Sequence, residues 1–149
     1  GACLFVRRKE FLAVGGFDED FFAHQEEIDL CWRLQARGGT IAYVGSSTVY
    51  HLGGATLSAA NPKKTFYNFR NTLLLIVKNV AGSNAWKIII SRLILDGVAG
   101  VQFLTQGKWK HFLAILNAHL SFYKLLPTFL KKRKKWAMLL SFFHTCASK

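Results

Sequence analysis

Six of the eight acidic residues in this chain lie close together in the segment GGFDEDFFAHQEEIDLCWRL, residues 15–34. They are Asp18, Glu19, Asp20, Glu26, Glu27 and Asp29. A carboxylate beside aromatic side chains and a glycine-rich turn can accept a proton from a substrate hydroxyl, and its pKa depends on how far its neighbours desolvate it. The same acids also fit a simpler role, because carboxylates in the first turn of a helix stabilise it through the helix dipole. Spacing alone leaves both interpretations open.

The direction of these carboxylates depends on a helix that the sequence predicts from Glu26 onward. Glu26 and Glu27 fall in its first turn, Asp29 and Arg33 form an i,i+4 pair, and Gly38 marks the end of the helix. Neighbouring side chains on a helix point about 100° apart, so the two glutamates cannot both face one substrate. One can act as a base while the other positions or caps, and the sequence does not decide which.

The remainder of the front half predicts the strands and turns of an α/β protein. Residues 2–6 form a short apolar run typical of a buried strand, and the helical turn after it ends at a glycine pair. Residues 40–51 predict two short strands, separated by a turn at Gly45 and closed by His51. A histidine at the end of a strand is more often structural than a metal ligand, so His51 alone does not define a metal site.

The basic charge of the chain is concentrated in its second part. Residues 61–149 hold fifteen Lys and Arg against Asp96 alone, whereas residues 1–60 hold five against seven acids. Basic charge supplies nonspecific affinity for nucleic-acid phosphates. No helix-turn-helix, zinc or RNP-type signature accompanies it here, and we therefore expect no nucleic-acid partner.

Three apolar helices are predicted in this second part, around residues 66–80, 86–104 and 112–130. The last two are as long as a membrane span requires, yet charged residues interrupt both. Basic side chains beside apolar faces, and the run KKRKK at 131–135, are typical of helices in a membrane interface. We expect residues 81–149 to form amphipathic, membrane-associated helices on an anionic membrane surface. Whether they span the membrane or lie flat is left open, and packing against the rest of the protein is the alternative.

The order of motifs resembles the C-terminal half of a family 2 glycosyltransferase, and most closely the bacterial rhamnosyltransferase-like enzymes. GACLFVRR is followed by GGFDEDFF, by EEIDLCWRL and by a segment ending VYHLGG, and YNFRNTLLLIVKN resembles the Arg-Asn helix that commonly follows. The resemblance covers residues 1–80. It implies an α/β fold there, the C-terminal half of a GT-A (Rossmann-like) domain on the acceptor side, followed by the helices of residues 81–149. It also implies a piece of a longer protein that is inactive alone, because the donor-binding half with its Asp-x-Asp motif does not precede it.

The resemblance assigns roles to the acidic cluster position by position. Glu27 falls where the family has its catalytic base, with a Glu in place of the usual Asp, and Glu26 and Asp29 match the neighbouring acids of that motif. Glu26 remains the alternative base. His51 falls where relatives place a metal ligand. The residues that match the acceptor-binding loop are Gly16, Phe17 and Asp18.

The activity that this resemblance implies is an inverting transfer from a nucleotide-sugar donor to a saccharide or lipid-linked acceptor, in cell-surface polysaccharide synthesis. Glu27 would deprotonate the acceptor hydroxyl, and a divalent metal, Mg²⁺ or Mn²⁺, would stabilise the departing diphosphate. The expected location is the cytoplasmic face of the bacterial inner membrane. The alternative is a membrane-associated interaction or scaffold module without chemistry. The enzyme hypothesis expects one of the two glutamates and His51 to line a single pocket.

Overall fold

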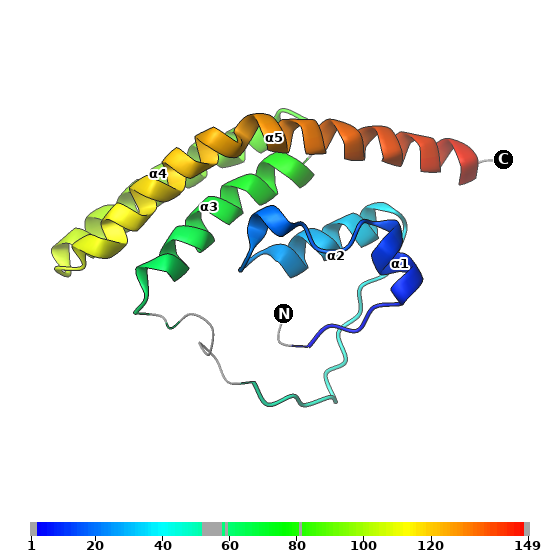
Figure 1. Ribbon diagram of the computed structural model, residues 1–149, viewed down its shortest axis with the longest axis horizontal. Helices are drawn as coiled ribbons and strands as arrows, with labels where there is room; N and C mark the ends of the chain where they lie inside the picture. The colour runs from blue at the N-terminus through cyan, green and yellow to red at the C-terminus, as the bar shows by residue number, and fades with distance from the viewer. Residues whose placement is uncertain (1–2, 52–57, 59, 81, 148–149) are drawn as a thin grey trace.

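The computed structural model of the chain describes residues 3–51, 58, 60–80 and 82–147, with side chains described as far as residue 137. It is 70% helical. Its elements in chain order are α1 (Arg8–Ala13), the 3₁₀ turn η1 (Glu19–Phe21), α2 (Glu26–Ala36), α3 (Pro62–Asn79), α4 (Asn84–Thr105) and α5 (Trp109–Ala147). Figure 1 shows α3, α4 and α5 running alongside one another, with α1 and α2 on the side of α3 away from α4.

The α/β prediction is wrong, because no strand forms anywhere in the described ranges. A strand is stabilised by hydrogen bonds to its neighbours, and a two-stranded hairpin alone is marginal in water. Residues 40–51 find no such neighbours, and Tyr43 and Tyr50 are 91% and 96% exposed. The predicted turn does form, with Ser47 donating to the Val44 carbonyl at 3.1 Å. The glycines expected to follow His51 lie outside the described residues. The described chain is therefore not half of a Rossmann-like GT-A domain.

The helices of the front half begin and end where local signals place them. After α1 the backbone turns through Gly15 and Gly16, whose φ angles of +80° and +66° lie in the left-handed region that glycine adopts without strain. The N–H of Gly16 donates to the Phe11 carbonyl at 2.9 Å, which closes the turn. At the end of α2, Gly38 has a φ of +84° and plays the same part. These predictions are confirmed because their causes lie within a few residues of each other.

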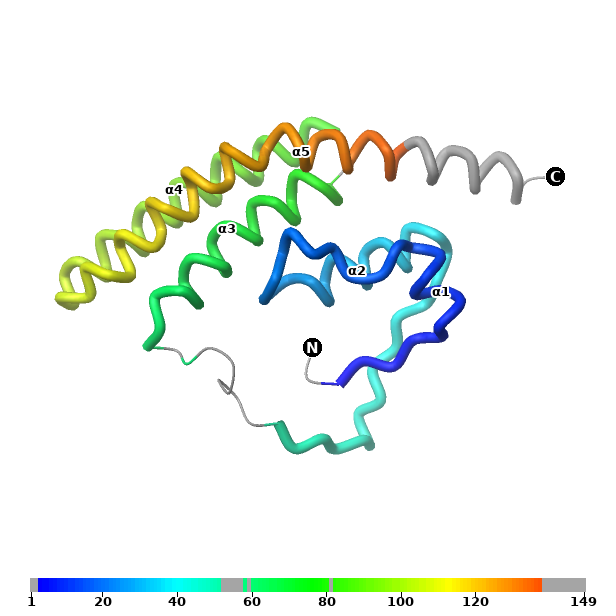
Figure 2. The backbone as a smooth tube through the Cα atoms, in the orientation of Figure 1, coloured from blue at the N-terminus to red at the C-terminus, as the bar shows by residue number. Residues whose placement is uncertain are grey.

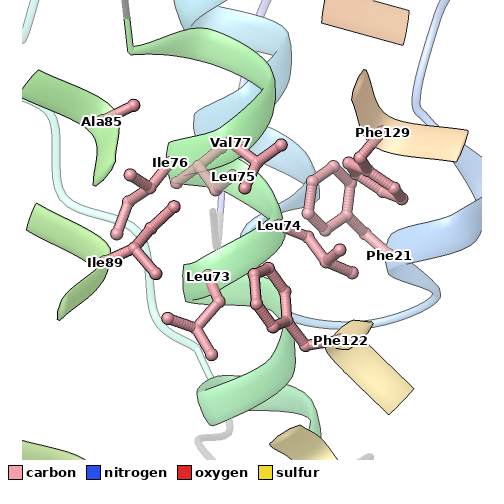
Figure 3. Close-up of a cluster of buried hydrophobic side chains, with 10 residues drawn as sticks. All are labelled: Phe21, Leu73, Leu74, Leu75, Ile76, Val77, Ala85, Ile89, Phe122 and Phe129. Atoms are coloured by element: carbon pink, nitrogen blue, oxygen red, sulfur yellow. The ribbon is translucent and has the colours of Figure 1, made fainter. Parts of the chain in front are cut away.

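α3 is the central element of the core. Asn61 caps it by accepting from the Lys63 N–H at 3.0 Å, and Pro62 follows at a position where its missing N–H costs nothing. Five consecutive residues, 73–77, are buried, which requires neighbours on several sides of the helix. Figure 3 shows Leu74 pointing towards Phe21 and Phe129, and Ile76 pointing towards Ala85 on the other side. α3 thus packs against α4, α5 and the acidic turn together.

α4 and α5 form a pair of antiparallel helices, and α3 runs beside this pair (Figure 2). At one end of the pair, the Thr65 hydroxyl lies 2.7 Å from Nδ1 of His111. A Cβ on Gly100 would lie 3.2 Å from the Phe112 ring, so the absence of a side chain allows the two helices to approach closely. Asp96 is buried between them, 3.0 Å from Nε2 of His119. The boundary between residues 1–80 and 81–149 stays a prediction.

Candidate functional site

The acidic turn between α1 and α2 begins with Asp18. One of its carboxylate oxygens accepts from the Asp20 N–H at 3.2 Å, and the 3₁₀ turn η1 follows directly. A short side chain that accepts from a nearby backbone N–H in this way initiates a turn. The turn brings Asp18 and Asp20 beside basic side chains from α3 and α5, which are remote in the sequence.

A buried ionic cluster surrounds Asp29. Its side chain is fully buried, and Arg33 lies 2.7 Å away in the predicted i,i+4 pair. Nζ of Lys78 in α3 donates to the same carboxylate at 2.8 Å, and the side-chain amide of Asn79 donates to its other oxygen at 2.9 Å. Both oxygens of Asp29 therefore have donors, as a buried charge requires. This arrangement suits a residue that fixes its surroundings, and the predicted catalytic role of Asp29 stays a prediction.

Arg33 connects this cluster to the glycine turn. Its guanidinium donates to the carbonyls of Val14 and Gly16, the latter at 2.7 Å. Arg33 is 3% exposed, so its donors are almost entirely removed from solvent and depend on these acceptors. The planar fork of an arginine suits this use, because it can hold a carboxylate and two carbonyls at once. The cluster thereby positions the loop that carries Gly16 and Phe17, two of the predicted acceptor-binding residues.

Two lysines hold the acidic turn against the helices. Lys78 lies 2.7 Å from one carboxylate oxygen of Asp18, and Lys132 of α5 donates to the other. Lys132 also lies 2.7 Å from Asp20. Its neighbour Arg133 donates to the carbonyls of Val77 and Gly82, at 3.2 and 3.1 Å. Two residues of the KKRKK run, Lys132 and Arg133, therefore face the protein and anchor α5 to the acidic turn and to the end of α3.

The ionisation of Asp18 gives a testable pH dependence. Burial raises the pKa of its carboxyl, but hydrogen bonds from Lys132 and Lys78 outweigh burial and hold the pKa below the ordinary value of 3.8. A carboxyl with a lowered native pKa stabilises the fold above its unfolded pKa, and this contribution disappears as pH falls through the native pKa. We expect urea midpoints to fall on acidification below the ordinary value, and to fall less for Asp18→Asn. Identical acid profiles for the two proteins would contradict this assignment.

The glutamate pair lies at the start of α2, where both side chains are half-buried. Oε2 of Glu26 is a buried atom with no hydrogen-bond partner among the described residues. The loop before the pair is strained, because Phe22, His24 and Gln25 have φ angles of 59°, 67° and 76°. Residues other than glycine in this region cost on the order of 1–3 kcal/mol each and persist only where the surroundings enforce them. Such strain is often found at functional sites.

An open cavity of about 620 Å³ lies beside the acidic turn. Asp18 and Phe17 line it, as do Lys135 and Trp136 of α5. Gly16 is not among its lining residues, although its carbonyl accepts from Arg33 beside it. The cavity combines carboxylates and ammonium groups with two aromatic rings, a composition suited to a polar ligand that also has apolar faces.

The structure does not bring all the predicted site residues together. Glu26, Glu27 and His51 do not line the cavity that contains Asp18. His51 is exposed, and no group of three His, Cys, Asp or Glu suited to a metal ion occurs within the described part of the chain. These residues alone do not compose a metal centre, and the divalent metal stays a prediction.

Several residues of the site have no local signal in the sequence. They are Arg70, Asn71, Lys78, Asn79 and Lys132. The four residues of α3 lie at least 49 positions after their partners Phe21 and Asp29 in the sequence. Lys132 of α5 lies more than 100 positions after its partner Asp20. The available hint was the presence of polar residues inside the otherwise apolar segment FRNTLLLIVKN. Polar groups at such positions are expected to have specific partners.

Comparison with known proteins supports the class of glycosyltransferases for this chain, through a stretch of 51 residues. Over that stretch it is 49% identical to the N-acetylglucosaminyl-diphospho-decaprenol L-rhamnosyltransferase of Mycobacterium tuberculosis H37Rv. It is 39% identical to the rhamnosyltransferase WbbL of Escherichia coli K12 over 51 residues. The stretch is 34% of this chain, and it covers 17% and 19% of the two relatives. No protein-family model matches the sequence, and no solved structure matches it.

Proposed function

We propose that this chain is the C-terminal portion of a family 2 glycosyltransferase that transfers a sugar, with rhamnose as the first candidate, in cell-surface polysaccharide synthesis. The observation that carries the proposal is the likeness of 51 residues to enzymes named as rhamnosyltransferases. The donor is a nucleotide-sugar, bound mainly outside this chain. The acceptor is a saccharide or a lipid-linked saccharide, the class to which the acceptor in the name of the mycobacterial relative belongs.

The proposed reaction uses a carboxylate at the start of α2 as the base. Glu27 accepts the proton of an acceptor hydroxyl while that oxygen forms a bond to the anomeric carbon of the donor. The bond between this carbon and the diphosphate oxygen breaks, and the nucleoside diphosphate leaves with the electron pair. Attack from the face opposite the leaving group inverts the anomeric configuration. Glu26 remains the alternative base.

The cavity is the proposed place for the part of the acceptor that does not react. Sugars present hydroxyl groups at their edges and C–H groups on their faces. Asp18 can accept hydrogen bonds from hydroxyls, and the rings of Phe17 and Trp136 offer apolar surfaces within the same cavity. Binding energy from such a remote contact can orient the reacting hydroxyl towards the base.

The experiment that tests this function is a transfer assay with the complete protein. Nucleotide-activated L-rhamnose carrying an isotopic label is supplied with N-acetylglucosaminyl-diphospho-polyprenol in detergent. The expected product is a labelled disaccharide lipid whose anomeric configuration, measured by NMR, is opposite to that of the donor. If the folded protein transfers no sugar from a panel of nucleotide-sugars, the proposal fails and the scaffold alternative gains support.

We also propose that α4 and α5 dock on an anionic membrane surface, at the cytoplasmic face of the bacterial inner membrane. α4 is long and apolar enough to cross a membrane by length and composition. Only 17% of its most apolar window is buried, so most of this apolar surface is left uncovered by the protein. Its outward side chains include Ile90, Ile94, Val98 and Val101, each at least 60% exposed. Basic residues occur at both ends of the helix pair, at Lys87, Lys108, Lys110 and 131–135. An apolar strip bordered by basic charge complements anionic lipid.

The packing of α3 favours helices that lie flat over helices that span. Thr65 in the first turn of α3 contacts His111 in the first turn of α5, and Arg92 of α4 lies 5.4 Å from the Phe69 ring of α3. α3 therefore accompanies the pair almost to its tip. A spanning pair would take α3 into the hydrocarbon layer with Lys63 and Lys64, and each charge there is costly. A flat pair keeps α3 on the protein side and its charges in water.

The membrane proposal predicts a charge-dependent and face-dependent affinity for vesicles. We expect the complete protein to float with phosphatidylcholine vesicles that contain phosphatidylglycerol, and much less with phosphatidylcholine alone. Ile94→Glu with Val98→Glu should weaken binding about tenfold or more, because two apolar contacts become charges. Tyr43→Glu with Tyr50→Glu is the control, since it adds the same two charges at exposed apolar side chains that lie outside α4 and α5. Equal losses in both pairs, or equal binding to neutral vesicles, would contradict the proposal.

A further inference from the structure

The loop at residues 22–25 is held in a conformation that its own residues disfavour. Phe22, His24 and Gln25 all have positive φ, and none of them is glycine. Gln25 is the residue from which α2 begins, so its left-handed conformation sets the direction in which the helix leaves the loop. Because Glu26 and Glu27 come next, any relaxation of this loop would move both carboxylates. Something outside the loop must keep it in place.

Asn71 of α3 supplies that restraint. Its side chain is fully buried, and its Nδ2 lies 2.8 Å from each of three loop carbonyls, those of Phe21, Ala23 and His24. The amide nitrogen carries two hydrogens, so the three carbonyls share them. One side chain therefore gathers three carbonyls from four consecutive residues around a single point, which requires the backbone to curl.

Arg70 orients this amide. Its Nε donates to Oδ1 of Asn71 at 2.8 Å, so the oxygen of the amide faces the guanidinium and the nitrogen faces the loop. Nη2 of Arg70 also donates to the carbonyls of Asp20 and Phe21, at 2.8 and 3.3 Å. The guanidinium is in turn fixed against the rings of Phe66 and Tyr67, at 5.2 and 5.1 Å. These contacts connect α3 to four backbone carbonyls before α2, those of Asp20, Phe21, Ala23 and His24.

We propose that Asn71, oriented by Arg70, is a positioning residue for the catalytic carboxylate at the start of α2. The inference rests on the proposed sugar transfer, in which Glu27 or Glu26 is the base. Asn71 does not touch the substrate. It acts through the loop, by fixing where α2 begins and hence where the carboxylate meets the acceptor hydroxyl. A displacement of about 1 Å at that point can cost on the order of a hundredfold in rate.

The variant that tests the proposal is Asn71→Asp, which keeps the shape of the side chain and replaces the donor with an acceptor facing the loop carbonyls. Asn68→Asp on the same helix is the matched control, since it introduces the same charge and its side chain has no hydrogen bond to the described residues. We expect kcat to fall about a hundredfold for Asn71→Asp, with the KM for the donor within about threefold of wild type. Asn68→Asp should change kcat less than about twofold.

Two further measurements separate positioning from a general loss of structure. Amide hydrogen exchange at residues 22–25 should accelerate in Asn71→Asp and not in Asn68→Asp, while α4 stays protected. Arg70→Lys keeps the charge but not the fork that holds both Asn71 and the loop carbonyls, and should give an intermediate kcat. If Asn71→Asp fails to fold, Arg70→Lys tests the same restraint on the loop.

Each outcome bears on one of the two proposals. If kcat per folded molecule and loop exchange are the same in Asn71→Asp and Asn68→Asp, the positioning role is overturned. If Asn71→Asp lowers only the melting temperature, with kcat unchanged, the residue is structural and the inference is again overturned. If the wild-type protein transfers no sugar, the proposed function fails, and unchanged loop exchange in Asn71→Asp would then overturn the restraint independently.

Discussion

Replacing Asp29 with asparagine is expected to cost about 3–5 kcal/mol in the free energy of unfolding, because it removes one partner of a buried ionic cluster. The change preserves the volume of the side chain, so packing is not the cause. It leaves the buried guanidinium of Arg33 without its carboxylate, and the buried ammonium of Lys78 with Asp18 as its remaining carboxylate. A single domain is stable by only about 5–15 kcal/mol, so this loss is large. Urea denaturation followed by circular dichroism would measure it.

Asp20→Asn is the matched control for this prediction. Asp20 also pairs with a lysine, at 2.7 Å from Lys132, but its side chain is 40% exposed. Exposed ion pairs contribute about 0–1 kcal/mol, so the control should lose little. If the two variants lose the same free energy, the cluster around Asp29 does not stabilise the fold as the contacts indicate.

Glu27→Gln should abolish measurable sugar transfer, lowering kcat by about 10²–10⁴-fold, the usual contribution of a general base. The amide keeps the shape and most hydrogen bonds of the side chain but cannot accept the proton. In the proposed reaction the nucleotide-sugar is bound mainly outside this chain, so binding of the donor should be unchanged. Steady-state kinetics of the complete protein would measure kcat and the KM for the donor separately, and a melting curve would confirm that the variant is folded.

Glu26→Gln is the partner experiment, since the two neighbouring residues point in different directions from the same helical turn. Normal turnover in Glu27→Gln together with a collapse in Glu26→Gln would transfer the role of base to Glu26. Near-normal turnover in both variants would leave the acidic pair as a helix-stabilising feature and remove the chemical argument for this site. Only a loss confined to Glu27→Gln supports the assignment made here.

Local signals in the sequence predicted the helices of the front half and their ends, whereas α5 (Trp109–Ala147) continues well past the predicted range of 112–130. Gly15, Gly16 and Gly38 end helices because glycine enters the left-handed region freely, and the pairing of Asp29 with Arg33 follows from helical spacing. The strands failed for the complementary reason. The β-type pattern at residues 40–51 shows only that these residues are compatible with a strand. A strand forms only when a neighbouring strand pairs with it, and the pattern does not indicate whether one is present.

The candidate site was predictable only in part, for the same physical reason. The acids of the front half were visible as a cluster in the sequence. Their partners were not visible, because Lys78 reaches Asp29 across 49 positions and Asn71 reaches the loop across about as many. Tertiary packing of α3 chooses these partners. Hydrophobic periodicity indicates that α3 is buried but not which polar group its few polar residues will meet.

The contact between Lys132 and the acidic turn has a consequence for the order in which the protein is made. Lys132 follows Asp18 by 114 residues, and a ribosome adds roughly 5–20 residues per second. Lys132 is therefore synthesised on the order of ten seconds after the acidic turn that it contacts. During that interval Asp18 and Asp20 lack one of their cations, and the apolar side of α3 is uncovered. The first part of the site to be synthesised is thus among the last to reach its final form.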